Sequence, residues 1–214
     1  MAQRISNLYR LVTFPWFYSG VQSLMGGTRG TKRFVDEVVR AAPNMRVLDV
    51  GCGQGRLLQF LPDVDYTGID LNPSSIEAAR AIHGNRGRFL VGDVSRDLPG
   101  VTSTYDLIIL SAILHHLDDK DAHGLFSVLV GLLKPGGRIV TIDNVWLPKQ
   151  NVIAKLANAL DSGLNVRTPS EYIRLVEHVP VRVEQTIYRD LARIPYDHFC
   201  MTLTRLGADA TRMD

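Results

Sequence analysis

Five short apolar runs recur along the middle of the chain, and between them the apolar residues return at helical spacing. The runs lie near residues 45–50, 64–71, 87–91, 105–110 and 138–142. Their length suits strands, and the fourth run is almost wholly apolar, as expected for a central parallel strand that helices cover on both faces. Strands that alternate with helices at this cadence imply right-handed crossovers. The pattern therefore predicts an α/β fold with a doubly wound sheet.

The first two helices have recognisable boundaries. A helix over 31–42 is expected from its apolar spacing, with Thr31 as a plausible N-cap and Pro43 as its stop. A second helix, over 54–61, follows the first strand directly. Because it begins at the end of a strand, its free N–H groups and positive dipole end are expected to face any ligand bound there.

Two later helices are also marked by their ends. After the second strand, Asn72 followed by a proline competes with a capping box from Ser74 as the helix start, and Gly84 closes that helix. The other helix is expected over 119–133, because a Pro-Gly-Gly sequence begins at Pro135. Each helix fills a gap between consecutive strands, as a crossover connection requires.

The remaining segments divide the chain into five parts: an N-terminal arm (1–30), the core (31–143), a helical cap insertion (144–178), a closing β-hairpin (179–205) and a tail (206–214). The cap is expected to hold helices near 151–160 and 170–177, and the hairpin strands near 181–188 and 197–204. The arm contains an aromatic cluster and a glycine-rich turn, so it serves either as a packing segment or as a lid over the site.

A glycine-rich turn between the first strand and its helix is the strongest candidate for a binding site. Gly51, Gly53 and Gly55 alternate there, and residues without Cβ let the backbone take positive φ and approach a ligand closely. The second strand ends in Asp70, where an acid can accept both hydroxyls of a ribose. Arg56 stands where a dinucleotide-binding motif has its last small residue, which disfavours NAD.

These residues resemble the first two motifs of class I S-adenosylmethionine-dependent methyltransferases, of the small-molecule type. The matching sequences are VLDVGCGQG from Val47 and GIDLN from Gly68, and the match extends through the segments 92–94, 105–117 and 132–138. The resemblance covers roughly residues 45–143. It implies a mostly parallel, seven-stranded sheet with an antiparallel final strand and helices on both faces.

The resemblance also implies a cofactor, S-adenosylmethionine, with S-adenosylhomocysteine as product. The residues it assigns to the cofactor are Asp49, Gly51, Gly53, Gly55, Asp70, Leu71, Asp93, Val94, Leu110 and Ser111. In this assignment the glycine turn holds the methionine part, Asp70 the ribose and Leu71 the adenine face. Taken singly, Asp49 could instead fix the first turn, Asp93 could be an ordinary turn residue, and Leu71 could belong to the core.

His115 and His116 follow the fourth strand, where a base is needed if the acceptor is an alcohol or a phenol. Histidine has a suitable pKa for that role. Being adjacent, the two side chains are expected to point in different directions, and His116 is slightly favoured as the base or acceptor-orienting group. The alternative is that both support the turn into the next helix, with Asp118 and Asp119 as its caps.

Substrate contacts are expected at the rim of the same edge, where polar and aromatic residues gather in several loops. The candidates are Tyr18 in the arm, Asp143 and Asn144 after the fifth strand, and Arg193, Tyr196 and His198 around the last hairpin. Arg193 could pair with a substrate carboxylate or phosphate, or with a neighbouring aspartate. The fourth strand lacks the Asn/Asp-Pro-Pro-aromatic run of methyltransferases that modify exocyclic base amines.

Composition narrows the partners. The 214 residues carry 24 basic and 22 acidic side chains and no Lys/Arg block, so nucleic acid is disfavoured as a partner. Cys52 and Cys200 lie far apart with no metal-ligand spacing, which predicts free thiols and no metal. The apolar run 11–18 is broken by Pro15 and is too short for a membrane span, so a cytoplasmic location is expected.

The sequence thus predicts a methyltransferase for a small-molecule acceptor, with oxygen favoured and nitrogen or carbon open. RNA or protein methylation, and binding of the cofactor without catalysis, stay as alternatives. The oligomeric state is left open.

Overall fold

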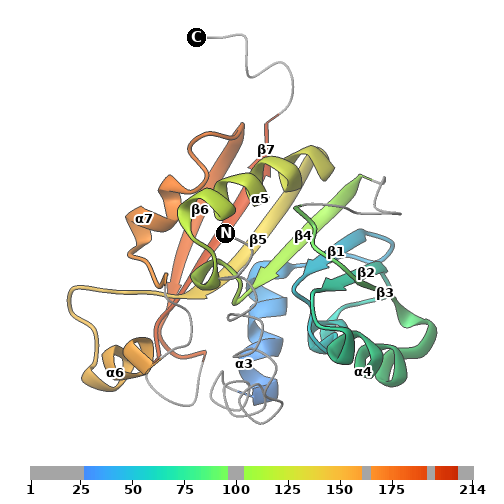
Figure 1. The fold of residues 1–214 in the computed structure, drawn as a ribbon, viewed down its shortest axis with the longest axis horizontal. Coiled ribbons are helices and arrows are strands. Elements are labelled where there is room, and N and C mark those ends of the chain that lie inside the picture. The colour runs from blue at the N-terminus through green and yellow to red at the C-terminus, as the bar shows by residue number, and fades with distance from the viewer. Residues whose placement is uncertain (1–26, 96–103, 161–164, 192–195, 207–214) are drawn as a thin grey trace, which may run out of the picture.

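Seven strands form one sheet, in the order β3-β2-β1-β4-β5-β7-β6 (Figure 1). The computed structural model describes residues 27–95, 104–160, 165–191 and 196–206. The strands are β1 (Arg46–Val50), β2 (Asp65–Asp70), β3 (Arg88–Val91), β4 (Tyr105–Ser111), β5 (Leu133–Asn144), β6 (Val181–Tyr188) and β7 (His198–Arg205).

The strand pairing is parallel from β3 to β5, and β7 runs antiparallel to both β5 and β6. The chain builds outward from β1 to β3 and then returns to place β4 on the other side of β1. This reversal is the switch point at which doubly wound sheets bind ligands. The predicted fold class is confirmed, including the antiparallel final strand.

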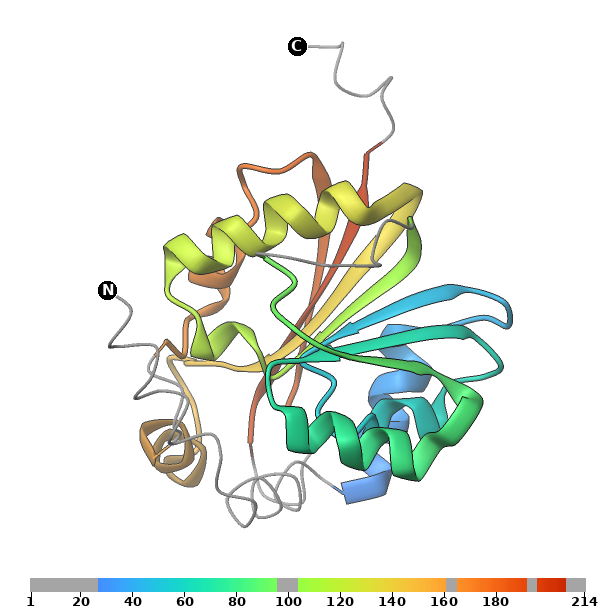
Figure 2. The same ribbon diagram turned by 45° about the vertical axis from the view of Figure 1, so that its right-hand side comes forward.

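Helices cover both faces of the sheet, and alternate residues of the central strands serve the two faces. In β4, Ile108 and Leu110 pack in one apolar cluster with α5 (Asp119–Leu132) and residues of α7 (Pro169–Arg174). Leu107 and Ile109 pack in a second cluster with α4 (Pro73–His83) and the first helical segment. Figure 2 shows α5 and α3 (Gly27–Phe34) on opposite sides of the sheet.

The first helical segment differs from the prediction. Helix α3 spans Gly27–Phe34 and continues as a π turn, η1 (Val35–Val39), which closes when the Arg40 N–H donates to the Val35 carbonyl. The expected N-cap Thr31 lies inside α3. The stretch 27–30 is helical rather than a turn, because tertiary contacts override the weak helix propensity of its glycines.

The segment after the glycine turn is also shorter than expected. Instead of a helix over 54–61, a single 3₁₀ segment, η2 (Arg56–Phe60), follows Gly55, whose φ of 71° is left-handed. A left-handed residue cannot continue a right-handed helix, and Pro62 forces the preceding Leu61 to be extended. The helix dipole invoked for the ligand site is therefore weak.

The other predicted boundaries lie close to those observed. Asn72 is the N-cap of α4, since its side chain accepts from the Ser74 N–H at 3.0 Å, and Gly84 is the C-cap. A short 3₁₀ segment, η3 (Gly84–Arg86), follows. Strand β5 begins five residues before the expected start, and the pairing with β4 shifts register across its Pro-Gly-Gly segment.

The insertion after β5 contains α6 (Val152–Leu160) and α7, as predicted. Figure 1 shows α6 beyond the carboxyl end of β5, at the edge where a ligand is expected. Among the described residues, no helix is both long enough and apolar enough to cross a membrane.

Candidate cofactor and active site

The glycine turn and the acid of the second strand meet at the carboxyl edge of the sheet. The Gly51 and Cys52 N–H groups both donate to the Ile69 carbonyl, at 2.7 and 3.1 Å. The Gly53 N–H donates to Asp70 Oδ2 at 2.9 Å, and the Asn72 N–H donates to Asp70 Oδ1 at 2.8 Å. Asp70 thus fixes the turn and lies within one site with it.

Positive φ angles at Gly51, Gly53 and Gly55, between 54° and 71°, confirm that the turn needs residues without Cβ. The space beside two of these glycines belongs to the protein itself. A Cβ on Gly51 would lie 2.2 Å from Ile113 Cδ1, and one on Gly55 would lie 2.9 Å from the Phe89 ring. The turn is therefore packed tightly against its neighbours, and its contact with a ligand stays a prediction.

The strand ends next to Asp70 offer an apolar surface and a second acid. Leu71 is 49% exposed, so it does not belong to the core, and its position suits packing on a flat ring. Asp93 follows β3 and accepts from the Ser95 N–H and hydroxyl, at 2.9 and 2.6 Å, while Val94 is buried. These contacts show that Asp93 shapes its own turn, and its contact with a base stays a prediction.

Asp49 is fully buried beneath the glycine turn. Tyr66 donates its hydroxyl to Asp49 Oδ2 at 2.7 Å. Burial raises the pKa of Asp49 to about 7; the Tyr66 hydrogen bond opposes this, and the nearby Asp70 charge adds to it. Tyr66 is not among the site residues predicted from the sequence. The period of two along neighbouring parallel strands was the available signal, because it places residues 47, 49 and 66 on one face.

The predicted histidines lie in a 3₁₀ turn, η4 (Leu114–His116), directly after β4. His115 is buried, and its Nδ1 lies 2.8 Å from Asp143 Oδ1 at the end of β5. The His115 backbone N–H also donates to Asp143 Oδ1, at 3.2 Å. Burial raises the pKa of Asp143, and the bonds from His115 oppose that rise.

His116 lies against His115, with ring centroids 4.0 Å apart and an interplanar angle of 45°. The expectation that the two side chains point apart is therefore wrong, because the tight turn brings the consecutive rings into contact. Asp118 caps α5, accepting from the Asp121 N–H at 2.8 Å, as predicted. Asp119 instead pairs with Arg167.

The backbone before η4 reaches the glycine turn. Leu110 is buried, Ser111 ends β4, and Ala112 has a φ of 58°, which is unusual for a residue with a side chain. Ala112 donates its N–H to the Ile142 carbonyl at 2.8 Å. This conformation directs the following residue, Ile113, over Gly51.

The predicted substrate residues that the structure describes are buried at strand ends rather than exposed at a rim. Asp143, Asn144 and His198 are at most 4% exposed, because β5 and β7 pair up to this point and Asn144 also contacts Asn158 and Tyr172 of the cap. Asn144 donates to the Tyr196 hydroxyl at 2.8 Å, and Tyr196 packs edge-on against His198. Tyr18 and Arg193 lie outside the described residues.

Sequence comparison places these features in a family. Residues 47–137 match a family model described as a methyltransferase domain. The matched segment contains the glycine turn, Asp70, Asp93 and the histidine turn, on a sheet with the switch point described above. The matched segment, which is less than half of the chain, is a methyltransferase domain. The family and the cofactor predicted from the sequence are thereby confirmed.

Similar methyltransferases differ in the acceptors that their names give. Phosphoethanolamine N-methyltransferase 3 of Arabidopsis thaliana is 37% identical over 131 residues, covering 58% of this chain and 26% of its own length. The ubiquinone/menaquinone biosynthesis C-methyltransferase UbiE of Shewanella woodyi is 29% identical over 166 residues, covering 72% and 64%. The chain thus spans less than two thirds of either relative.

Among solved structures, the mitomycin 7-O-methyltransferase MmcR superposes with a TM-score of 0.70 at 20% identity, over 92% of this chain and 60% of that one. At this identity the likeness shows the fold alone.

The residues present fit the methyltransferase cofactor. An ionised carboxylate offers about four acceptor positions, and Asp70 uses two of them for the backbone N–H groups of Gly53 and Asn72. Two positions are then left for ribose hydroxyls, beside the apolar surface of Leu71 and within reach of the glycine turn. The Asp70 carboxylate suits the ribose of S-adenosylmethionine, and the exposed Leu71 suits its flat adenine ring. The left-handed backbone of the glycine turn suits its charged methionine part.

Proposed function

We propose that the protein methylates a small molecule with S-adenosylmethionine, that oxygen is the favoured acceptor atom, and that His115 is the base. The observation that carries the proposal is the buried His115–Asp143 pair, at the end of β4 next to the glycine turn. The bound cofactor supplies a methyl group on a positively charged sulfur, which the acceptor displaces in line. Nitrogen and carbon acceptors stay possible, as the relatives' names illustrate.

The geometry suits proton removal from a hydroxyl. Asp143 accepts at His115 Nδ1, so a proton on Nδ1 leaves the Nε2 lone pair to take the acceptor's proton. The second oxygen of Asp143 is buried and has no hydrogen-bond partner within the described ranges. A buried carboxylate favours a cationic or proton-donating neighbour, so it stabilises His115 once it has taken a proton.

Exclusion of water supports the reaction, because charge is neutralised as the methyl group moves. His115 and Asp143 are 5% and 1% exposed, so both lie in such an environment. Alignment of acceptor and methyl group supplies much of the rate, on the order of 7 kcal/mol when the geometry is good.

Cofactor binding is the first test. Calorimetric titration with S-adenosylhomocysteine is expected to show binding, and NAD none. Asp70→Ala is expected to weaken binding by about 100-fold or more, since two charge-assisted hydrogen bonds of about 1.5–3 kcal/mol each are lost. Asp65→Ala, at the exposed start of the same strand, is the matched control and should bind as the wild type does. Equal losses in both variants would contradict the assignment of Asp70.

The acceptor class is tested by incubation with methyl-tritiated cofactor. Label in a small-molecule extract is expected. Label confined to RNA or protein fractions would favour the macromolecular alternative, and binding of S-adenosylhomocysteine without label transfer to any fraction would favour a cofactor-binding protein without catalysis.

The base is tested on the labelled acceptor. His115→Gln is expected to lower kcat by about 10²- to 10⁴-fold, the usual contribution of a general base. His116→Gln removes the neighbouring ring but keeps His115, the partner of Asp143, so a much smaller loss is expected. Undiminished turnover in His115→Gln would remove it from the mechanism.

A further inference from the structure

A buried arginine of the cap forms hydrogen bonds with the backbone of the turn that carries the histidines. Arg167 is 6% exposed and makes five hydrogen bonds, so each of its five N–H groups has a partner. Nη1 donates to the Leu114 carbonyl at 2.8 Å, and Nη2 donates to the Leu117 carbonyl at 2.7 Å. These carbonyls flank the two histidines on either side.

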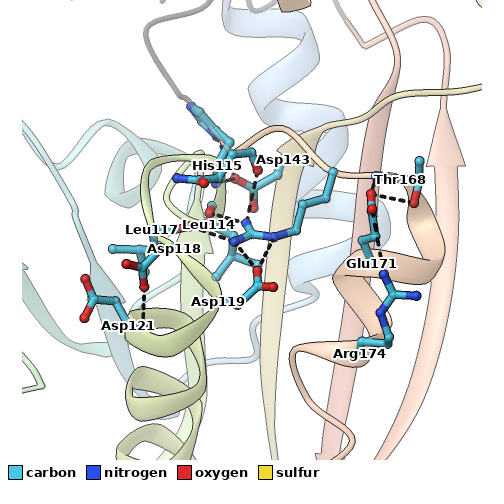
Figure 3. Close-up of polar contacts among 12 residues, drawn as sticks. Leu114, His115, Leu117, Asp118, Asp119, Asp121, Asp143, Thr168, Glu171 and Arg174 are labelled. Atoms are coloured by element: carbon cyan, nitrogen blue, oxygen red, sulfur yellow. Dashed lines mark hydrogen bonds and ion pairs between the residues drawn. The ribbon is translucent and has the colours of Figure 1, made fainter.

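The remaining bonds of Arg167 tie the turn to the cap and to α5. Nε and Nη2 donate to Asp119 Oδ1 at 3.0 and 2.7 Å, and Nη1 also donates to the Asn165 carbonyl at 3.1 Å. Figure 3 shows Leu114, Leu117 and Asp119 gathered beneath His115 and Asp143. The guanidinium also lies 5.8 Å from the centre of the Tyr172 ring.

The backbone of the same cap segment also forms a hydrogen bond with the histidine turn. The Asn165 N–H donates to the His115 carbonyl at 3.1 Å. On its other side the segment is fixed to the end of β5, through a parallel bridge from Val145 to Arg167 and a bond from the Trp146 N–H to the Arg167 carbonyl. Carbonyls of three turn residues, 114, 115 and 117, are therefore held by the cap.

A buried guanidinium is costly unless its donors are satisfied, and this one is paired with a single carboxylate whose side chain is 74% exposed. A charge pair with so exposed a partner stabilises the fold little. Most of the contacts of Arg167 go instead to backbone carbonyls of one short turn. Arginine suits this task because its donors form a rigid planar fork, whereas lysine concentrates its donors on one nitrogen.

We propose that Arg167 is a positioning residue, which holds the histidine turn so that His115 Nδ1 stays bonded to Asp143. The cap that covers the acceptor side thereby sets the orientation of the base. This inference rests on the proposed function for the role of His115, but the contact itself is tested without any acceptor.

The test is the nitrogen NMR spectrum of the histidine rings, which reports the tautomer of each imidazole. The full-length protein is labelled with ¹⁵N-histidine, and Asp143→Asn provides the reference spectrum in which the carboxylate is absent. In the wild type, His115 is expected to carry its proton on Nδ1. In Arg167→Met the Nδ1–H signal is expected to be lost or mixed with the other tautomer, because the turn carbonyls lose their donors.

Two further variants separate positioning from general loss of structure. Arg167→Lys keeps the charge beside Tyr172 but cannot bridge both carbonyls, so an intermediate spectrum is expected. Arg174→Met removes an exposed arginine of the same cap, whose nearest acid, Glu171, lies 3.7 Å away, and should leave the spectrum unchanged. If Arg167→Met does not fold, Arg167→Lys decides alone. An unaltered His115 signal in folded Arg167 variants would overturn the proposal.

Titration with S-adenosylhomocysteine separates this inference from the proposed function. Affinity is expected to stay within about twofold of wild type in the folded Arg167 variants, because Arg167 contacts neither the glycine turn nor Asp70 in the structure. Absence of binding to the wild type would defeat the proposed function. Normal binding together with an unchanged His115 signal would defeat the positioning role only.

Discussion

Single residues of the glycine turn fix the packing around the proposed cofactor site. Gly51 needs a left-handed φ of 68° and also leaves the space that Ile113 fills, while Gly53 donates to Asp70. Ile113 stands two residues before His115. The conformation at one glycine is therefore coupled through a packed side chain to the turn that carries the proposed base.

Gly51→Ala is expected to destabilise the protein more than Gly136→Ala does. Both sites have positive φ, which costs an alanine about 1–2 kcal/mol, but a Cβ on Gly136 meets nothing within 4 Å, whereas one on Gly51 overlaps Ile113. Urea unfolding measures the difference. Ile113→Ala in the Gly51→Ala background should relieve the steric overlap and restore that part of the stability. The cost of the positive φ at position 51 should remain. Equal losses at both glycines would show that Ile113 moves aside freely.

At the scale of elements, the start of α5 is fixed by a single side chain. Helix α5 begins after Asp118, which accepts from the Asp121 N–H, and it carries five buried residues onto the sheet. Because α5 begins directly after the histidine turn, its first residue also fixes where that turn ends. The N-cap therefore stands between the helix and the turn that carries the proposed base.

Asp118→Ala is expected to lower the free energy of unfolding by about 1 kcal/mol, the usual contribution of an N-cap. Asp118→Ser keeps a capping oxygen and should lose only a fraction of that. Asp121→Ala is the control, because it removes an acid of the first turn but keeps the backbone N–H that donates to Asp118. Urea unfolding of the three variants is the measurement, and a loss at Asp121 equal to that at Asp118 would contradict the capping role.

The elements that sequence could predict are those whose burial leaves a local pattern. The strands were predictable because residues such as Ile108 and Ile109 are buried on opposite faces of the sheet, which produces an apolar run. The start of α3 was not, since its glycines favour a turn locally. The choice of His115 over His116 was not either, because it depends on Asp143, 28 positions away, and on the geometry of the turn.

The candidate cofactor residues were easier to bring together from the sequence than the candidate acceptor residues, for the same reason. The glycine turn and Asp70 end consecutive parallel strands, so the topology brings them together once the strands are assigned. Arg167 has no such signal. It lies between two helices of the cap, and its partners are backbone carbonyls, which leave no trace in side-chain patterns.

At the scale of the whole molecule, two buried ionisable groups in different parts of the sheet oppose each other in their effect on stability. Burial raises the pKa of Asp49, in β1, to about 7. Burial lowers the pKa of His198, in β7, to about 4, against a hydrogen bond at Tyr196 that works the other way. Unfolded aspartate and histidine titrate near about 3.9 and 6.5, so the two windows overlap.

The signs of the two effects follow from where the proton sits. Between about pH 4 and 7 the folded protein keeps a proton on Asp49 that the unfolded chain has lost, so this group makes the free energy of unfolding fall as pH rises. Between about pH 6.5 and 4 the unfolded chain binds a proton at His198 that the folded protein does not bind. His198 therefore makes the free energy of unfolding fall as pH drops.

Asp49→Asn and His198→Gln are accordingly expected to change the pH profile in opposite directions. Without Asp49 the free energy of unfolding should rise more steeply with pH between about 4 and 6.5, and without His198 it should fall or rise less steeply over the same window. Urea unfolding at closely spaced pH values measures both slopes, and all other titrating groups are common to the two variants. Slopes that both shift in the same direction from wild type would mean that at least one of these side chains does not titrate as its burial requires.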